Sequence, residues 1–177
     1  MGKQLSREAW LVQGQRALAS EGPNALRVVQ LASKLGVTRG SFYWHFRDIE
    51  DFCSQLLEEW RQRSTDEIIR DLDTEAEPVR LKLLFRRAFK AQDTLERAMR
   101  AWALDNIAVK QAVAEVDKER VSYVCRLLKS AGLSERKAQS RASFIYFAYL
   151  GHTLILDTVL SEITDTALDD LADLFRG

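Results

Sequence analysis

Glycine and proline, the residues that interrupt regular helices, are scarce in this chain. Its 177 residues include eight glycines and two prolines, together about 6% where an average protein has roughly 12%. Both prolines, Pro23 and Pro78, lie where the apolar periodicity already breaks. No run of four or more residues alternates apolar with polar side chains, as a half-buried strand would. The sequence therefore predicts an all-α fold.

Apolar residues recur at helical spacing in about nine segments, most of them bounded by capping residues. The expected helices span residues 6–21, 28–35, 38–46, 48–72, 78–92, 93–102, 105–131, 135–162 and 166–175. The expected caps at helix starts are Thr38, Asp48, either Asp105 or Asn106, and Ser134, with capping boxes at Asp93–Glu96 and Thr166–Asp169. Gly36 and Gly132 are expected at helix ends. We expect a three-helix domain over 1–47 and a larger helical domain over 48–177, connected by the helix 48–72.

Composition and charge exclude several classes of protein. Lysine and arginine number 26, as do aspartate and glutamate, so the chain is not a generic polycation. Cys53 and Cys125 are too few for a disulfide framework, and no secretory leader is recognisable at the N-terminus. The apolar stretch 144–160 contains polar residues and is not expected to cross a membrane. We expect a cytoplasmic protein that needs no cofactor and, with two histidines, binds no metal.

The segment from Val28 to Phe46 has the pattern of a helix-turn-helix. Ala32 is small enough to let two helices cross closely, and Gly36 can make the tight turn between them. In the second helix Phe42 and Phe46 share one face, which must pack inward. The outward face presents Arg39, Gly40, Ser41, Tyr43, Trp44 and His45. Because the second helix of such a motif contacts bases in the DNA major groove, the sequence predicts a DNA-binding protein.

The distribution of charge supports this prediction. Residues 1–47 contain seven basic and two acidic residues, a net charge of +5, and the remainder of the chain carries −5. Lysine and arginine bind DNA largely through its phosphates. The N-terminal part of the chain is therefore the part expected to meet DNA.

Two stretches of this region are distinctive, Gly22-Pro-Asn-Ala-Leu26 and Leu31-Ala-Ser-Lys-Leu-Gly-Val-Thr-Arg-Gly-Ser-Phe-Tyr-Trp-His-Phe46. They resemble the tetracycline-repressor (TetR) family of transcriptional regulators. The similarity covers about residues 5–60, and the later helices agree with that family in number and length. The resemblance implies a DNA-binding N-terminal domain followed by a helical domain that binds an effector and dimerises.

The resemblance also implies roles for single residues. In similar proteins the residues matching Tyr43 and His45 touch DNA phosphates, and those matching Arg39, Gly40 and Trp44 face bases. This chain lacks the phosphate-binding lysine that many relatives carry after the recognition helix. Further candidates for contact with DNA are Thr38 at the helix start and Arg7, Arg27 and Arg47.

A single recognition helix reads few base pairs, so such proteins usually bind palindromic operators as two-fold dimers. The helix 135–162 is apolar on nearly all sides after Ser143 and, with the final helix 166–175, is expected to form a four-helix dimer interface. The expected interface residues are Ala148, Gly151, Ile155, Leu156, Val159, Leu168, Leu171 and Phe175. The alternative is that the helix 135–162 is only the central core helix.

Large apolar side chains are frequent in the middle helices and suit an apolar cavity with a few polar tips. They are Phe85, Phe89, Met99, Trp102, Tyr123, Phe144, Tyr146 and Tyr149. We expect a small, mostly apolar or aromatic effector to bind here, to move the helix 48–72 and to change the spacing of the two recognition helices. Repression released by the effector is the commoner outcome in similar proteins. The alternative is that these side chains only pack the body.

Two other function classes are weighed against a DNA-binding regulator. A small helical enzyme is disfavoured because the sequence has no Glu-x-x-His pair, phosphate-binding loop or nucleophile motif, and we expect no enzymatic activity. A helical module that binds another protein through residues 28–46 is the second alternative. Salt dependence distinguishes it from a DNA-binding protein, because phosphate contacts weaken steeply as salt rises.

Overall fold

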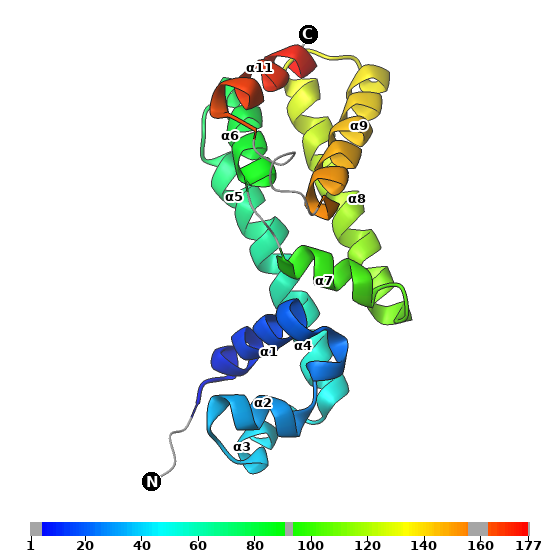
Figure 1. Ribbon diagram of the computed structural model, residues 1–177. Helices are drawn as coiled ribbons and strands as arrows, with labels where there is room; N and C mark the ends of the chain where they lie inside the picture. Colours follow the sequence, from blue (N-terminus) through cyan, green and yellow to red (C-terminus); the bar gives the residue numbers. More distant parts are fainter. Residues whose placement is uncertain (1–4, 91–93, 156–162, 177) are drawn as a thin grey trace. The chain divides into compact units, whose positions relative to one another are not determined.

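The computed structural model describes residues 5–90, 94–155 and 163–176 (Figure 1). Every regular element in these ranges is a helix, which confirms the all-α fold. Within the same ranges no helix is both long enough and apolar enough to cross a membrane.

The helices agree closely with the periodicity of the sequence. In chain order they are α1 (Arg7–Glu21), η1 (Pro23–Ala25), α2 (Val28–Leu35), α3 (Arg39–Tyr43), α4 (Ile49–Arg61), η2 (Gln62–Asp66), α5 (Glu67–Asp73), α6 (Glu77–Lys90), α7 (Thr94–Trp102), α8 (Ile107–Ser130), α9 (Glu135–Leu154) and α11 (Asp165–Arg176). The helix expected over 48–72 is present as α4, η2 and α5, where η2 is a wider π-helical turn. The sequence predicts that the helix corresponding to α9 ends at residue 162, which lies outside the described residues.

The helices group into two compact units. Unit 1 comprises residues 1–63 and 94–113, and unit 2 comprises residues 64–93 and 114–177. One boundary therefore falls inside η2 and another inside α8. The division into functional domains over 1–47 and 48–177 stays a prediction.

Unit 1 has an aromatic core in which α1, α3 and α4 meet. Trp10, Phe42 and Phe52 are completely buried, and the ring centroids of Trp10 and Phe42 are 5.3 Å apart. Gly14 lets α1 approach α4 closely, because a Cβ atom there would lie 2.5 Å from Phe52 Cζ and 2.7 Å from Leu56 Cδ1. A larger residue at position 14 would force these helices apart.

Several helix ends form as the sequence predicts. Asp48 Oδ1 accepts a hydrogen bond from the Asp51 backbone N–H at 2.7 Å, and Asn106 Oδ1 accepts one from the Val109 N–H at 3.1 Å. Gly36 ends α2 with φ 68°, and Gly132 follows α8 with φ 96°. Residues with a Cβ atom rarely adopt these positive angles.

Other predicted caps are wrong. Thr38 and Ser134 occupy N-cap positions, but neither side chain makes a capping hydrogen bond. The final helix begins at Asp165 and not at the expected capping box, because Thr164 Oγ1 accepts a hydrogen bond from the Ala167 N–H at 3.2 Å. The helix expected to reach Phe46 ends at Tyr43 and continues as a turn, in which the Phe46 N–H donates to the Phe42 carbonyl.

Unit 2 is built on a second apolar core. Its buried members come from α5, α6, α8, α9 and α11: Leu72, Leu81, Phe85, Phe89, Tyr123, Val124, Cys125, Leu127, Leu128, Ala138, Ala142, Ile145, Leu168 and Ala172. The long helices α8 and α9 carry most of these residues.

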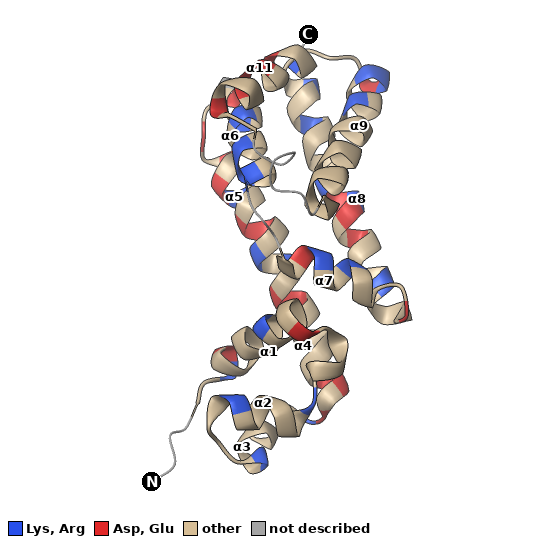
Figure 2. Cartoon of the chain, in the orientation of Figure 1, with Lys and Arg blue, Asp and Glu red and all other residues tan. Residues whose placement is uncertain are grey.

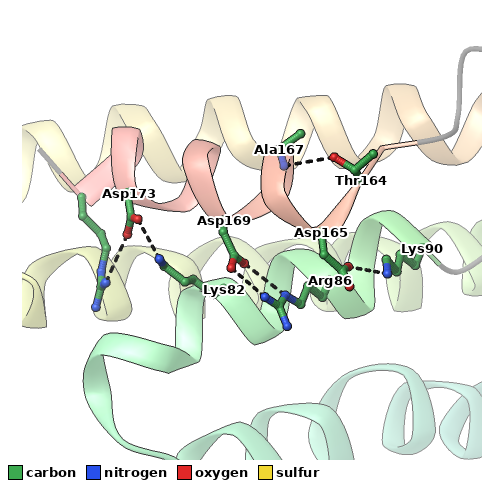
Figure 3. Close-up of polar contacts among 9 residues, drawn as sticks. Lys82, Arg86, Lys90, Thr164, Asp165, Ala167, Asp169 and Asp173 are labelled. Carbon is green, nitrogen blue, oxygen red and sulfur yellow. Dashed lines mark hydrogen bonds and ion pairs between the residues drawn. The ribbon is translucent and has the colours of Figure 1, made fainter.

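A row of ion pairs joins α6 to α11. Figure 2 shows basic residues along α6 and acidic residues along α11, and Figure 3 shows the pairs in detail. Lys82 Nζ lies 2.7 Å from Asp173 Oδ2, Arg86 binds both carboxylate oxygens of Asp169 at 3.0 and 2.6 Å, and Lys90 binds Asp165. The basic residues recur every four positions on α6 and the acidic ones every four positions on α11. We call these three pairs the α6–α11 ladder.

Candidate nucleic-acid interface

The helix-turn-helix is formed by α2, the turn after it and α3. Leu31 and Ala32 of α2 are buried, and the Val37 N–H donates to the Ala32 carbonyl at 3.0 Å, which fixes the turn. The left-handed Gly36 ends α2 and directs the chain into α3. These contacts hold α3 against α2 within unit 1.

The two faces of α3 and the turn after it differ completely in burial. Phe42 and Phe46 are 0% and 2% exposed, and Tyr43 and Trp44 are 60% and 82% exposed. The predicted orientation of the four aromatic residues is therefore correct. Two adjacent exposed rings form a contiguous apolar surface of a kind that can contact another molecule.

Most other residues predicted to contact DNA are also exposed. The structure places Arg7, Arg27, Thr38, Arg39, Gly40 and Arg47 at the surface, with Ser41 half-buried. The Arg47 N–H donates to Asp51 Oδ2 at 2.9 Å, which lowers the pKa of that carboxyl, and the Arg47 side chain is 86% exposed. Arg7 Nε donates to Gln55 Oε1 at 2.5 Å. The structure leaves the Arg47 side chain at the surface and ties Arg7 to α4.

His45 has a structural contact in the same unit. Its Nε2 atom lies 2.8 Å from the backbone oxygen of Leu5, directly before the Ser6 cap of α1. The ring is half-buried. His45 therefore links the end of α3 to the start of α1, and its contact with phosphate stays a prediction.

Residues 11–56 match the model of the bacterial regulatory proteins of the tetR family. This range contains most of α1, all of α2 and α3, and the first half of α4. This segment is therefore similar to the helix-turn-helix region of TetR-family proteins. The match confirms, for this segment, the resemblance to the TetR family that the sequence predicts.

The fold outside this TetR segment is also that of known regulators. The chain is similar to Escherichia coli NemR in its reduced form, with a TM-score of 0.74, 17% identity and coverage of 95% of this chain and 94% of that one. It is similar to a regulator from Saccharomonospora viridis in complex with choline (TM-score 0.72, 16% identity, coverage 96% and 92%). It is also similar to FadR from Bacillus subtilis in complex with stearoyl-CoA (TM-score 0.66, 16% identity, coverage 97% and 96%). No curated protein matches the chain in sequence.

The side chains expected to surround an effector are divided between the units. Met99 and Trp102 lie in unit 1, and the other six lie in unit 2. In unit 2 the centroid of the Tyr149 ring lies 6.4 Å from that of Phe89 and 5.8 Å from that of Tyr146. Phe144 is 63% exposed, so its ring lies at the surface of unit 2 and not in its interior.

The side chains expected at a dimer interface fall into three groups. Ala148, Gly151, Ile155 and Leu171 are exposed. Leu168 is completely buried in the core of unit 2, and Phe175 packs against that core, so Leu168 has no surface to offer a second chain. Leu156 and Val159 lie outside the described residues.

Sequence reasoning missed the exposed phenylalanines of α9 and several polar contacts. Phe144 and Phe147 are 63% and 67% exposed. Glu96 is completely buried in unit 1, where its Oε1 atom lies 2.7 Å from Arg100 Nη2. The spacing of four between these two residues was a signal that could have revealed the pair.

No group of three histidine, cysteine, aspartate or glutamate residues in the described ranges is placed to hold a metal ion. Burial, together with the nearby Glu50 carboxylate, raises the pKa of the Cys53 thiol to about 11. Cys53 is therefore a thiol at neutral pH, as expected for a packing residue.

Proposed function

We propose that this protein is a DNA-binding transcriptional regulator that recognises a palindromic operator as a homodimer. The observation that carries the proposal is the exposed face of α3, where Tyr43 and Trp44 stand beside Arg39 on a TetR-type helix-turn-helix. Arginine pairs well with the O6 and N7 atoms of guanine, and apolar groups pack on thymine methyl groups. The ten DNA-contact residues named from the sequence form the proposed interface, with the role of His45 shared between phosphate and Leu5.

Exposed apolar side chains on α9 and α11 support the dimer. On α9 the exposed residues Phe144, Phe147, Ala148 and Gly151 recur at helical spacing on one face. On α11 Leu171 and Leu174 are 39% and 69% exposed. The rings of Phe144 and Phe175 lie 6.1 Å apart and connect the two helices. Pairing of this face with the same face of a second copy would remove it from water.

We further propose that a small molecule bound in unit 2 changes the affinity for DNA, with repression as the basal state. The similar regulators determined with choline and with stearoyl-CoA support a small-molecule ligand. The Tyr149 ring, in contact with the rings of Phe89 and Tyr146, supplies apolar surface for it. The proposal needs no catalytic step, and it places the protein in the cytoplasm with the DNA that it binds.

Selection of bound sequences from a random pool of duplex DNA tests the proposal. We expect an enriched palindrome with half-sites about one helical turn apart. Affinity for the selected sequence should fall steeply as salt rises from about 50 to 200 mM. Recovery of no common sequence, or binding that does not depend on salt, would contradict DNA recognition and favour a module that binds another protein.

A further inference from the structure

Gly40 of α3 is a glycine that the fold does not require. The described glycines with a positive φ angle are Gly22, Gly36 and Gly132, so the backbone at Gly40 is one that any residue can adopt. Outside its own helix, the nearest heavy atom to a Cβ atom built at Gly40 is Thr38 Oγ1, at 3.7 Å. This is an ordinary van der Waals distance, and glycine inside a helix is less stable than alanine. Neither the backbone nor the packing of the described residues therefore explains the glycine.

Trp44 lies next to Gly40 on the outward face of the same segment. The backbone of Trp44 is still helical, with φ −73° and ψ −21°. Trp44 follows the buried Phe42 by two residues, and two residues turn a helix by about 200°, so the indole points away from the core and is 82% exposed. Gly40 comes four residues before Trp44, which places the two on one face.

The surface that Gly40 and Trp44 share is apolar. Gly40 has no side chain, and the indole of Trp44 has a single polar group, its N–H donor. The second helix of a helix-turn-helix lies in the major groove of DNA. Every base pair presents polar atoms there, but the one apolar group on these edges is the C5 methyl of thymine. A thymine methyl is therefore the part of a base edge that best matches this surface.

We propose that Gly40 and Trp44 recognise the C5 methyl group of a thymine in each half-site of the operator. The methyl group packs against the indole ring of Trp44 and over the bare backbone of Gly40, and both apolar surfaces leave water. A Cβ atom at position 40 would occupy the space that the methyl group needs, which accounts for the glycine. The inference rests on the proposed function, because it names a base that α3 recognises.

This contact differs in chemistry from the one proposed for Arg39. A guanidinium recognises guanine through hydrogen bonds to O6 and N7, whereas Gly40 and Trp44 recognise a base by shape and by the exclusion of water. The two contacts respond to different changes in the DNA. Removal of a methyl group affects only the second, so the two can be measured separately on one operator.

Deoxyuridine substitution in the selected operator tests the contact with the full-length chain. Uracil pairs with adenine as thymine does and keeps the O4 acceptor, so only the methyl group is lost. Each buried methyl group contributes roughly 3- to 5-fold in affinity. We therefore expect substitution of one thymine and its symmetry mate to weaken binding by about tenfold. A selected half-site without thymine, or one in which no thymine responds to the substitution, would overturn the proposal.

Two variants assign the methyl contact to these residues. Gly40→Ala should weaken binding to the thymine operator more than binding to the uracil operator, because its Cβ atom competes with the methyl group. Trp44→Ala should weaken binding because the ring is lost. In both variants the ratio of the two affinities should fall from about ten to about one, which fluorescence anisotropy titrations measure. A ratio that stays near ten in either variant would overturn the assignment.

Arg39→Ala is the matched control on the same helix. It should lower the affinity for both operators, because the bonds to guanine are lost, and keep the ratio between them near ten. A ratio that falls equally in Arg39→Ala would show that the methyl effect reports only how well α3 is seated, and would contradict the proposal. Circular dichroism should show the helical content of the wild type in all three variants, since Trp44 is exposed and a Cβ atom at Gly40 meets no close neighbour.

The failure of this inference differs from the failure of the proposed function. A chain that selects a palindrome but binds its thymine and uracil forms equally contradicts only the methyl contact. A chain that selects no operator contradicts the proposed function and this inference with it. A tenfold preference for thymine that disappears in Gly40→Ala and Trp44→Ala would support both.

Discussion

The helices α3 and α11 are both short and amphipathic, but they are attached by different forces. Within unit 1, α3 is held by Phe42, which is completely buried among the rings of Trp10 and Phe52. Within unit 2, α11 buries Leu168 and Ala172 and adds the α6–α11 ladder at its edge (Figure 3). Aromatic packing is insensitive to salt and pH, and exposed ion pairs are screened and titrate.

These two modes of attachment suit the different surfaces that α3 and α11 present. The outward face of α3 carries the proposed DNA contacts, so its position must not vary with the ionic conditions under which DNA is bound. The outward face of α11 carries Leu171 and Leu174, which are exposed in one chain. Attachment of α11 is therefore expected to respond to salt and acid more than attachment of α3.

The largest expected effect comes from the buried ring of α3. Phe42→Ala should lower the free energy of unfolding by about 3–5 kcal/mol, because it leaves a cavity among Trp10 and Phe52. Trp44→Ala, two residues away and 82% exposed, should change stability by less than about 0.5 kcal/mol and should weaken DNA binding. Urea unfolding and DNA titration of the two variants measure both effects. Similar losses of stability in both would contradict the assignment of faces.

The close approach of α1 and α4 gives the next largest effect on stability. Gly14→Ala places a Cβ atom 2.5 Å from Phe52 Cζ, and overpacking of this kind costs about 1–3 kcal/mol. The matched control is Gly40→Ala, where the nearest atom to the new Cβ is Thr38 Oγ1 at 3.7 Å. That control should be neutral or stabilising by up to about 1 kcal/mol. A stable Gly14→Ala protein would show that the core of unit 1 relaxes easily.

Loss of a base contact is expected to affect DNA binding without affecting stability. Arg39→Ala should weaken binding to the selected operator by about 1–3 kcal/mol, or roughly 5- to 150-fold, and relax the preference for one base pair. Arg136→Ala removes the same charge from an exposed position on α9 and should bind as the wild type does. Competition titrations with single-base operator variants measure the preference. Equal affinity in Arg39→Ala would exclude α3 as the reading helix.

Much of the DNA-binding segment could be predicted from the sequence. Gly36 predicts the end of α2, because glycine adopts a positive φ angle much more readily than other residues. The spacing of Phe42 and Phe46 predicts the inward face of the next helix. The exposure of Tyr43 and Trp44 then follows from geometry. These signals are local, within about ten residues of one another, so no knowledge of distant contacts is needed.

The contacts of unit 2 were less predictable because their partners are far apart in the chain. Asp165, Asp169 and Asp173 look like the solvent-facing side of the last helix, yet they face Lys82, Arg86 and Lys90 about 80 to 90 residues earlier. The π turn at η2 does not disturb the apolar spacing of the helix 48–72, so periodicity could not reveal it. Ser134 and Thr166 are common capping residues, but the geometry at α9 and the nearby Thr164 override them.

The smallest expected effect concerns the α6–α11 ladder. Hydrogen bonds from Lys90 and Lys82 lower the pKa of Asp165 and Asp173 below the ordinary value of 3.8. The two ion pairs therefore contribute fully to the free energy of unfolding when the pH is above 3.8. This contribution is lost as the pH falls through the lowered pKa of the folded state. The double variant Asp165→Asn/Asp173→Asn should be slightly less stable than the wild type at pH 7, and the difference should disappear in acid and in about 1 M salt.

Urea unfolding at several pH values measures this effect, with Asp170→Asn as the control. Asp170 is exposed on α11 but is outside the ladder, so its variant should keep the pH dependence of the wild type. A difference between the double variant and the wild type that persists in acid and in salt would show that α11 is held by packing alone, as α3 is.

The division of the chain into units affects how regulators of this kind can be recombined. Unit 1 takes α7 and the beginning of α8 from the middle of the sequence, and α7 packs directly on α1. A chimaera that transplants only the N-terminal 63 residues onto a foreign body would leave α1 to pair with an α7 that evolved beside another partner. Grafts of the DNA-reading part should therefore include residues 94–113 and be joined at three places instead of one.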